Sequence, residues 1–241
     1  MALNSSPTLL HNIPEITFEV HDVRGADASL IEEYLAIHGE LLPEYARYAP
    51  VMRLRAENPA DESTLEKWHQ WLLKLDGRPV GMIEFLYNRK RNAGILLDFA
   101  IHGKARDVYF QGFSRLAGLV LSLATRQLTL DAGESGHSAP LGMIAEVEHA
   151  RLVEKYKEYG FLKFPIEYFE PPFTPALSDM LAGEDNFDTI GYKEMYLGVF
   201  QIPGHSLDPN DPQLLKTVLL TLWEDHYCLP ADHWLLRKIQ P

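Results

Sequence analysis

Hydrophobic and polar positions follow two periods along the first part of the chain. Residues 16–20 alternate apolar and polar side chains, which is typical of a half-buried strand. The next segment repeats its apolar positions every three or four residues, which predicts a helix with Asp27 or Ser29 as the N-cap. Helical spacing returns over residues 41–56, and residues 64–70 are predicted to form another short helix.

The clearest local signal is a hairpin. Two apolar runs, residues 71–75 and 78–87, are separated by Asp76 and Gly77. An Asp-Gly pair between two such runs predicts a tight turn, because both central positions need a positive φ. A polar turn and a third apolar run at 94–101 follow, so the sequence predicts an antiparallel meander with its third strand at the centre of a sheet.

The second half of the chain alternates helical and extended patterns. In order, the predicted elements are a long helix at 115–126, a polar loop at 128–140, a strand at 141–148, a short helix at 152–160 closed by Gly160, an extended run at 162–173 and a last strand at 192–200. A turn-rich linker at 203–212 then leads to two amphipathic helices, predicted at 214–227 and 232–239.

One stretch carries a family resemblance. Between two predicted strands, Leu152, Tyr156, Gly160 and Phe161 stand in the spacing Leu-x-x-x-Tyr-x-x-x-Gly-Phe. This arrangement, and the order of elements over roughly residues 16–200, resembles the GNAT superfamily of acyl-coenzyme A-dependent N-acyltransferases.

The resemblance implies an α/β (α+β) fold, with a GNAT-like central sheet that is mixed, mostly antiparallel and flanked by helices. We expect residues 1–202 to form the acyltransferase domain. Residues 203–241 are expected to be a C-terminal helical extension that packs on the same domain.

The resemblance also implies where the chemistry lies. In this family the strands matching 94–101 and 141–148 are parallel neighbours that diverge at their C-terminal ends, and acyl-CoA lies between them. Tyr156 stands where the family has a tyrosine that protonates the leaving thiolate, and Asp98 stands where many relatives carry a carboxylate base. Glu146, on the neighbouring strand, is a further candidate for moving a proton.

The cofactor implied is acetyl-CoA or another acyl-CoA, with its pyrophosphate at the start of the long helix. The residues expected to bind it are Ile101, Lys104, Arg106, Gln111, Gly112, Phe113 and Ser114. The loop departs from the family pattern, because Tyr109 stands where an Arg or Gln is usual. Lys104, Arg106 and Gln111 could supply the missing donors.

The predicted strands also carry several acidic residues. Glu84, Asp98, Glu146 and Glu148 could each be a solvated or salt-bridged residue, but together they suggest an acidic groove that attracts a cationic amine. The acceptor would then be an amine of a small molecule or a peptide. The alternative is a GNAT-fold protein that has lost catalysis and binds a metabolite or a protein partner, which the irregular loop at 103–112 favours.

Composition limits the classes of partner that the protein is expected to bind. The 241 residues carry a formal net charge of -12, which argues against nucleic acid and anionic membranes as partners. Cys228 is the one cysteine, so neither an internal disulfide nor a cysteine-ligated zinc site is expected, and no metal is predicted. No signal-peptide pattern or membrane-spanning run is present in the sequence, so a cytoplasmic protein is expected. The oligomeric state stays open, with a dimer as one possibility.

Overall fold

Eight strands form one mixed sheet. The computed structural model describes residues 16–59, 65–106, 108–109, 115–172 and 191–239. Within this part the strand order is β1-β2-β3-β4-β5-β8-β6, with β7 paired to the start of β8, and every pairing except β4 with β5 is antiparallel. The strands are β1 (Phe18–Asp22), β2 (Glu66–Leu75), β3 (Arg78–Asn88), β4 (Ala93–Ile101), β5 (Met143–Val147), β6 (Phe161–Lys163), β7 (Tyr168–Glu170) and β8 (Lys193–Phe200). The predicted mixed, mostly antiparallel sheet is therefore confirmed.

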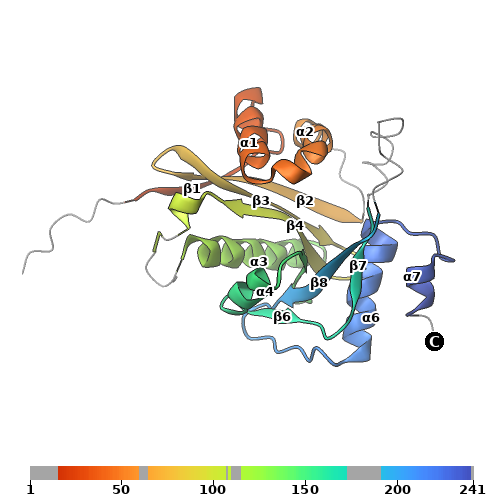
Figure 1. Ribbon diagram of the computed structural model, residues 1–241. Coiled ribbons are helices and arrows are strands. Elements are labelled where there is room, and N and C mark those ends of the chain that lie inside the picture. The colour runs from red at the N-terminus through yellow and green to blue at the C-terminus, as the bar shows by residue number, and fades with distance from the viewer. Residues whose placement is uncertain (1–15, 60–64, 107, 110–114, 173–190, 240–241) are drawn as a thin grey trace, which may run out of the picture.

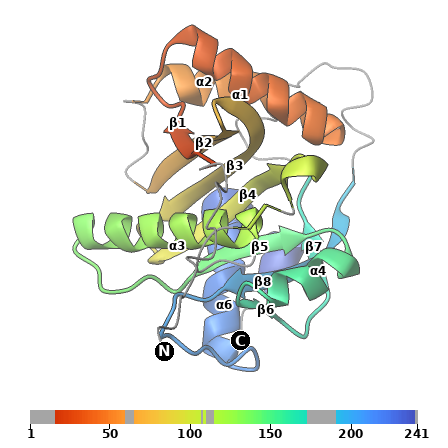
Figure 2. The same cartoon turned by 90° about the vertical axis from the view of Figure 1, so that its left-hand side faces the viewer.

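Helices cover both faces of this sheet (Figures 1 and 2). They are α1 (Ala28–Leu41), η1 (Pro43–Tyr48), α2 (Ala49–Glu57), η2 (Gly103–Ala105), α3 (Leu116–Glu134), α4 (Ala150–Lys157), α6 (Pro212–Leu220), η4 (Thr221–His226) and α7 (Trp234–Arg237). One face packs on α3 and α4. The opposite face packs on α1 and α2 at one end, and on α6, η4 and α7 at the other. None of the described helices is both long and apolar enough to cross a membrane.

The alternation of side chains along β3 shows how the second face is divided. Met82 packs in the core under α1 and α2, whereas Leu86 packs in the core under the C-terminal helices. Glu84 lies between them on the same face, because successive side chains of a strand point to opposite faces. A buried carboxylate thus occupies the seam between the two groups of helices, 2% exposed.

Several predicted elements are confirmed in detail. The turn between β2 and β3 has positive φ at Asp76 (49°) and Gly77 (73°), as expected for Asp-Gly. The N-cap of α1 is Asp27, whose side chain accepts a hydrogen bond from the backbone N–H of Leu30. Gly160 follows α4 with φ 83°, a conformation that favours glycine.

Two sequence predictions are wrong. The short helix predicted over residues 64–70 is instead the start of β2, because Glu66 to Leu75 pair along almost the whole of β3. The loop predicted at 128–140 begins too early, since α3 continues to Glu134. Leu128 and Ala132 are fully buried, so the apolar face of this helix continues beyond the predicted end at residue 126.

The remaining boundaries need smaller corrections. Residues 41–56 form η1 and α2 rather than one helix, and the run at 162–173 is divided into β6 and β7. The helix expected at 214–227 ends in the π-helical turn η4. These C-terminal segments pack on Ile95 and Ile144 of the sheet, while the boundary between residues 202 and 203 stays a prediction.

The parallel pair β4–β5 separates soon after it forms. Its register joins Gly94 with Met143, Ile95 with Ile144 and Leu96 with Ala145, and the pairing stops there. β4 continues to Ile101 along β3, whereas β5 continues to Val147 along β8. The predicted divergence of these two strands is confirmed.

A β-bulge lies at the point of divergence. Glu84 pairs with Asp98 and Phe85 pairs with Leu96, so Leu97 is an extra residue on β4. Bulges bend a strand and change the direction of its side chains. Here the bulge coincides with the end of the β4–β5 pairing, so it contributes to the opening between the strands.

A buried charged cluster joins α3 to β2 on the other face. Asp131, with a fully buried side chain, contacts His69 Nε2 at 2.8 Å and Lys67 Nζ at 2.9 Å. Burial alone would raise the pKa of Asp131, but the hydrogen bonds from His69 and Lys67 outweigh burial and lower it. Burial opposes the charged form of His69, yet Asp131 and Asp22 outweigh it and raise the His69 pKa.

Asp131→Asn should lower the free energy of unfolding by about 3 kcal/mol, because it leaves two buried partners without their counter-charge. Urea denaturation at pH 7 measures this. In the wild type, the stability that Asp131 contributes is lost as pH falls through its lowered pKa. The stability that His69 contributes is lost as pH rises through its raised pKa.

The control is Glu134→Gln. It removes a second ion pair of Lys67, made by a side chain that is 66% exposed. It should cost less than about 0.5 kcal/mol; equal effects of the two substitutions would refute the role given to the buried cluster.

Candidate active site

Three adjoining cavities follow the opening between β4 and β5. The inner cavity, of about 70 Å³, lies against Trp68, Glu84, Glu170 and Tyr227, and the middle cavity, of about 140 Å³, lies against the ends of β4 and β5. The outer cavity, of about 400 Å³, lies between β4, α3 and α4. Inner and middle cavities share the walls Tyr45, Leu97, Asp98, Glu146 and Glu170; middle and outer cavities share Leu42, Phe99, Leu152 and Tyr156. The three thus lie in a row through the sheet where the strands diverge, and this row is called the passage below.

The outer cavity is lined by positive charge. Arg106, Arg115 and Lys155 contribute to its wall, and Arg106 is oriented by a 2.8 Å hydrogen bond from its Nε to the carbonyl oxygen of Ile101. Ile101 and Arg106, two of the residues predicted to bind the cofactor, line this cavity, and so do Arg115 and Lys155, which were not predicted. Arg115 begins the predicted long helix, and Lys155 lies within the predicted helix at 152–160, so their positions beside the opening were the available signal.

The other predicted cofactor residues are placed differently. Lys104 is exposed in η2, next to the outer cavity but outside its lining. Gln111, Gly112, Phe113 and Ser114 lie outside the described residues, so their assignment to a phosphate site stays a prediction.

Tyr156 lies at the junction of the outer and middle cavities. Its ring packs edge-on against Phe200 and Phe161, with centroids 5.2 and 6.0 Å away. Burial raises the pKa of Tyr156 to about 12, and the charge of Arg106 only partly opposes this. The phenol is therefore protonated throughout the physiological pH range, so it can donate a proton but cannot serve as a base.

Asp98 projects from the bulge of β4 into the middle and inner cavities. Its Oδ2 lies 3.6 Å from Nε2 of His38, a side chain of α1 that is completely buried. Neither ring nitrogen of His38 has a hydrogen-bond partner among the residues that the structure describes. A carboxylate on a cavity wall is thus backed by a buried imidazole.

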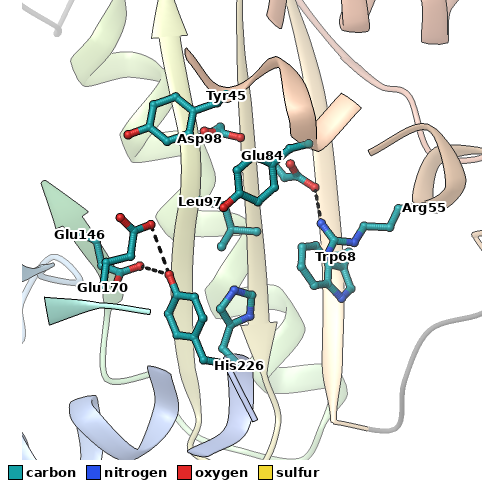
Figure 3. A pocket seen from close by; sticks show the side chains of 11 residues that line it. Tyr45, Arg55, Trp68, Glu84, Leu97, Asp98, Glu146, Glu170 and His226 are labelled. Atoms are coloured by element: carbon teal, nitrogen blue, oxygen red, sulfur yellow. Dashed lines mark hydrogen bonds and ion pairs between the residues drawn. The ribbon is translucent and has the colours of Figure 1, made fainter. Parts of the chain in front are cut away.

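Glu146 and Glu170 form a carboxylate pair on one side of the inner cavity (Figure 3). The hydroxyl of Tyr227 lies 2.9 Å from Glu146 Oε2 and 3.4 Å from Glu170 Oε1, and the hydroxyl of Tyr168 donates to Glu146 Oε1. Burial, followed by the charge of Glu170, raises the pKa of Glu146 to about 8. Burial likewise raises the pKa of Glu170. The pair therefore holds a proton near neutral pH.

The opposite side of the inner cavity carries an ion pair. Arg55 Nη1 lies 3.2 Å from Glu84 Oε1, and the guanidinium lies over the ring of Trp68 at 3.5 Å from its centroid (Figure 3). Burial raises the pKa of Glu84 to about 7, although Arg55 acts in the opposite direction. Among the described residues, Arg55 supplies the one guanidinium of this wall, and it is already paired with one of the carboxylates.

The C-terminal segment contributes His226 and Tyr227 to the inner cavity. The turn that presents them is fixed by Asp225, whose buried carboxylate contacts Lys90 at 2.7 Å and Arg91 at 2.8 Å. In the sequence Asp225-His226-Tyr227-Cys228, three side chains of types that can bind a metal ion stand within four residues. Among the described residues, no group of three or more His, Cys, Asp or Glu side chains is arranged to hold a metal ion.

The structure brings together most of the acidic residues that the sequence singled out. Asp98, Glu146 and Tyr156 line the passage, and Glu84 lies in the inner cavity. Glu148 also borders the passage, but it is paired with Lys193 at 2.6 Å. Sequence reasoning did not identify further lining residues from distant elements, namely Tyr45, Tyr48, Arg55, Trp68, Glu170, His226 and Tyr227.

Solved structures of GNAT acetyltransferases resemble this chain. A putative acetyltransferase from the GNAT family of Bacteroides thetaiotaomicron is 16% identical, with 84% of this chain and 95% of that chain covered and a TM-score of 0.45. A chimera of Vibrio cholerae spermidine N-acetyltransferase SpeG and hSSAT is 12% identical, with 78% and 96% covered and a TM-score of 0.48. A GNAT-family acetyltransferase from Streptococcus pneumoniae is 14% identical, with 77% and 99% covered and a TM-score of 0.47.

The sequence itself matches no family model and no curated protein. Identities and TM-scores this low say nothing about reaction or substrate. The fold is therefore defined by the strand order and by the divergence of β4 and β5 in this chain.

Glu146→Gln should raise the free energy of unfolding at pH 9 more than at pH 5. A buried carboxyl whose pKa is raised opposes folding once pH exceeds its unfolded value, and the neutral amide avoids this cost. We expect the gain at pH 9 to exceed that at pH 5 by roughly 2–4 kcal/mol, measured by urea denaturation.

The matched control is Glu148→Gln, two residues further along. The salt bridge and hydrogen bond from Lys193 outweigh burial and lower the pKa of Glu148. Its substitution should therefore destabilise the protein at pH 7, with the opposite sign. A pH-independent effect of Glu146→Gln would show that this carboxyl is not held protonated by its surroundings.

Proposed function

We propose that the protein is a GNAT-type N-acyltransferase that moves an acyl group, acetyl in the simplest case, from coenzyme A to an amine. The observation that carries the proposal is the passage through the sheet, which is cationic at its outer end and acidic at its inner end. An anionic donor and a cationic acceptor would enter from opposite ends. They would meet at the middle cavity, beside Asp98 and Tyr156.

The outer cavity suits acyl-CoA in charge and in size. Arg106, Arg115 and Lys155 line about 400 Å³ of space and would hold the phosphates of the coenzyme. Beyond Leu96 and Ala145, the facing edges of β4 and β5 no longer pair with each other. Backbone groups on such an edge can pair with the amides of an extended ligand, as a sheet accepts an added strand. When bound, acyl-CoA supplies an activated thioester.

The side chains at the middle cavity can handle the protons of the reaction. Asp98 accepts a proton from the ammonium of the acceptor and so frees the nitrogen lone pair for attack on the thioester carbonyl. His38 lies directly behind Asp98 and would act on it as a positioning residue rather than as a group that touches substrate. Tyr156 donates its hydroxyl proton to the departing sulfur, and the second proton that the nitrogen loses as the amide forms restores the phenol. Glu146 is the alternative route for the amine proton, since it borders the same cavity.

One observation favours a second function. Tyr109 stands where the family pattern has Arg or Gln in the phosphate loop, so the same passage could bind a metabolite without transferring an acyl group. Binding of CoA separates the two functions, because only the acyltransferase requires it.

Lys155→Ala should weaken CoA binding about fivefold, corresponding to roughly 1 kcal/mol for one phosphate contact at a partly exposed site. Isothermal titration calorimetry with CoA measures the change, which should shrink as salt concentration rises. The matched control is Lys157→Ala on the same helix, since Lys157 is exposed and paired with Glu154 at 2.6 Å, away from the cavity. If both variants bind CoA alike, the outer cavity is not the coenzyme site.

Tyr156→Phe should lower kcat by about tenfold or more while leaving the free energy of unfolding nearly unchanged, because only a proton donor is removed. The reaction is followed with an amine acceptor found by screening. Tyr192→Phe serves as the control, since Tyr192 is exposed and lines none of the three cavities. A Tyr156→Phe enzyme with wild-type turnover would rule out Tyr156 as the acid.

A further inference from the structure

The inner cavity has more negative than positive groups on its walls. Its carboxylates are Glu84, Asp98, Glu146 and Glu170, and its one guanidinium, Arg55, pairs with Glu84. Glu146 receives only tyrosine hydroxyls as hydrogen-bond partners among the described residues. Burying several carboxylates around one guanidinium is unfavourable, so a further positive group would stabilise this wall.

Aromatic rings complete the same cavity. Tyr45, Tyr48 and Tyr227 line it together with Trp68. Burial raises the pKa of Tyr48 to about 12, so this phenol is neutral and presents a ring and a hydroxyl rather than a charge. Neutral aromatic rings beside carboxylates suit an organic cation, because the ring faces attract positive charge while the methylene groups of the ligand gain apolar contacts.

An independent observation concerns His38. This side chain is completely buried and points at Asp98 from behind the cavity wall, yet it has no hydrogen-bond partner in the described part of the chain. An orphaned buried polar group calls for an explanation, and a charged ligand at the Asp98 wall would supply one. The polar groups at and behind this wall are thus incompletely satisfied among the described residues.

The inner cavity is separate from the place of reaction. Tyr156 borders the middle and outer cavities but not the inner one, so the nitrogen that receives the acyl group would lie in the middle cavity. A positive group in the inner cavity is then a different part of the acceptor. The spaces of about 70 and 140 Å³ limit this acceptor to a short molecule.

We propose that the inner cavity binds a second positive group of the acceptor, so that the substrate is a compact dicationic amine, of which a short α,ω-diamine is the simplest form. This inference rests on the proposed acyltransferase function, which alone would require only one amine. It also selects a small molecule over a peptide, because a short diamine fits two small adjoining cavities with charges at both ends.

Proton release should accompany binding. Titratable and charged groups from several elements face the Glu146–Glu170 pair. They are Arg47 and Tyr45 in η1, Glu84 on β3, Asp98 on β4, Tyr168 on β7, Lys193 on β8, and His226 and Tyr227 at the end of η4. With the raised pKa of Glu146 near 8, an entering cation competes with the proton on the pair. Affinity should therefore increase between pH 6.5 and 8.5, where an alkyl amine is still charged.

The test is calorimetric binding of 1,4-diaminobutane and of butylamine to the full chain at pH 8. We expect the diamine to bind at least about tenfold more tightly than the matched monoamine. Glu170→Gln should remove most of the preference for the diamine, because it removes one carboxylate of the Glu146–Glu170 pair. Glu167→Gln should keep it, since Glu167 is an exposed carboxylate of the same segment outside the cavities. Circular dichroism confirms that both variants are folded, and Trp68→Leu is the second variant that should reduce the preference.

The outcomes separate this inference from the proposed function. Equal binding of diamine and monoamine, or an unchanged preference in both Glu170→Gln and Trp68→Leu, would overturn the inference even if CoA binds. Diamine preference without any CoA binding would support the cation site and overturn the acyltransferase. Preference that weakens as pH rises would contradict the assignment of the cation to the carboxylate pair.

Discussion

The structure depends on where the pairing between β4 and β5 stops. Three residue pairs join these strands, and beyond Leu96 and Ala145 each strand follows a different neighbour. The extra residue Leu97 on β4 bends the strand at the same point. A continuous ladder would have closed the sheet. Its interruption opens a passage from the layer of α3 and α4 to the layer of α1, α2 and the C-terminal helices, and Asp98, Glu146 and Tyr156 border that passage.

The passage is maintained at a cost in stability. Glu84 and Glu146 are buried carboxylates with raised pKa values of about 7 and 8, and His38 is buried without a hydrogen bond in the described structure. Groups of this kind weaken a folded protein unless a ligand or a reaction uses them, and they gather at functional sites for that reason. The buried cluster around Asp131 shows the contrast, because its carboxylate is matched by His69 and Lys67 and serves the fold alone.

Local patterns predicted the sheet well, whereas the site was only partly predictable. Asp76-Gly77 identified the hairpin, and the spacing from Leu152 to Gly160 identified the helix that carries Tyr156. The pairing of residues 66–70 with β3 was missed, because a contact between strands outweighs a weak helical pattern. Asp98 was a candidate because the family resemblance implies a carboxylate base on that strand, and Glu146 because it lies on the neighbouring strand. Trp68, Glu170 and Tyr227 reach the cavity from far along the chain, and nothing in their local sequence distinguishes them from core residues.

The most direct measurement is a crystal structure of the protein with coenzyme A. The account predicts that the coenzyme lies between β4 and β5, with its phosphates toward Arg106, Arg115 and Lys155 and its sulfur beside Tyr156. The inner cavity would stay free of the coenzyme. Coenzyme density at another surface, or a ladder between β4 and β5 that continues past Leu96 and Ala145 and closes the passage, would contradict the account.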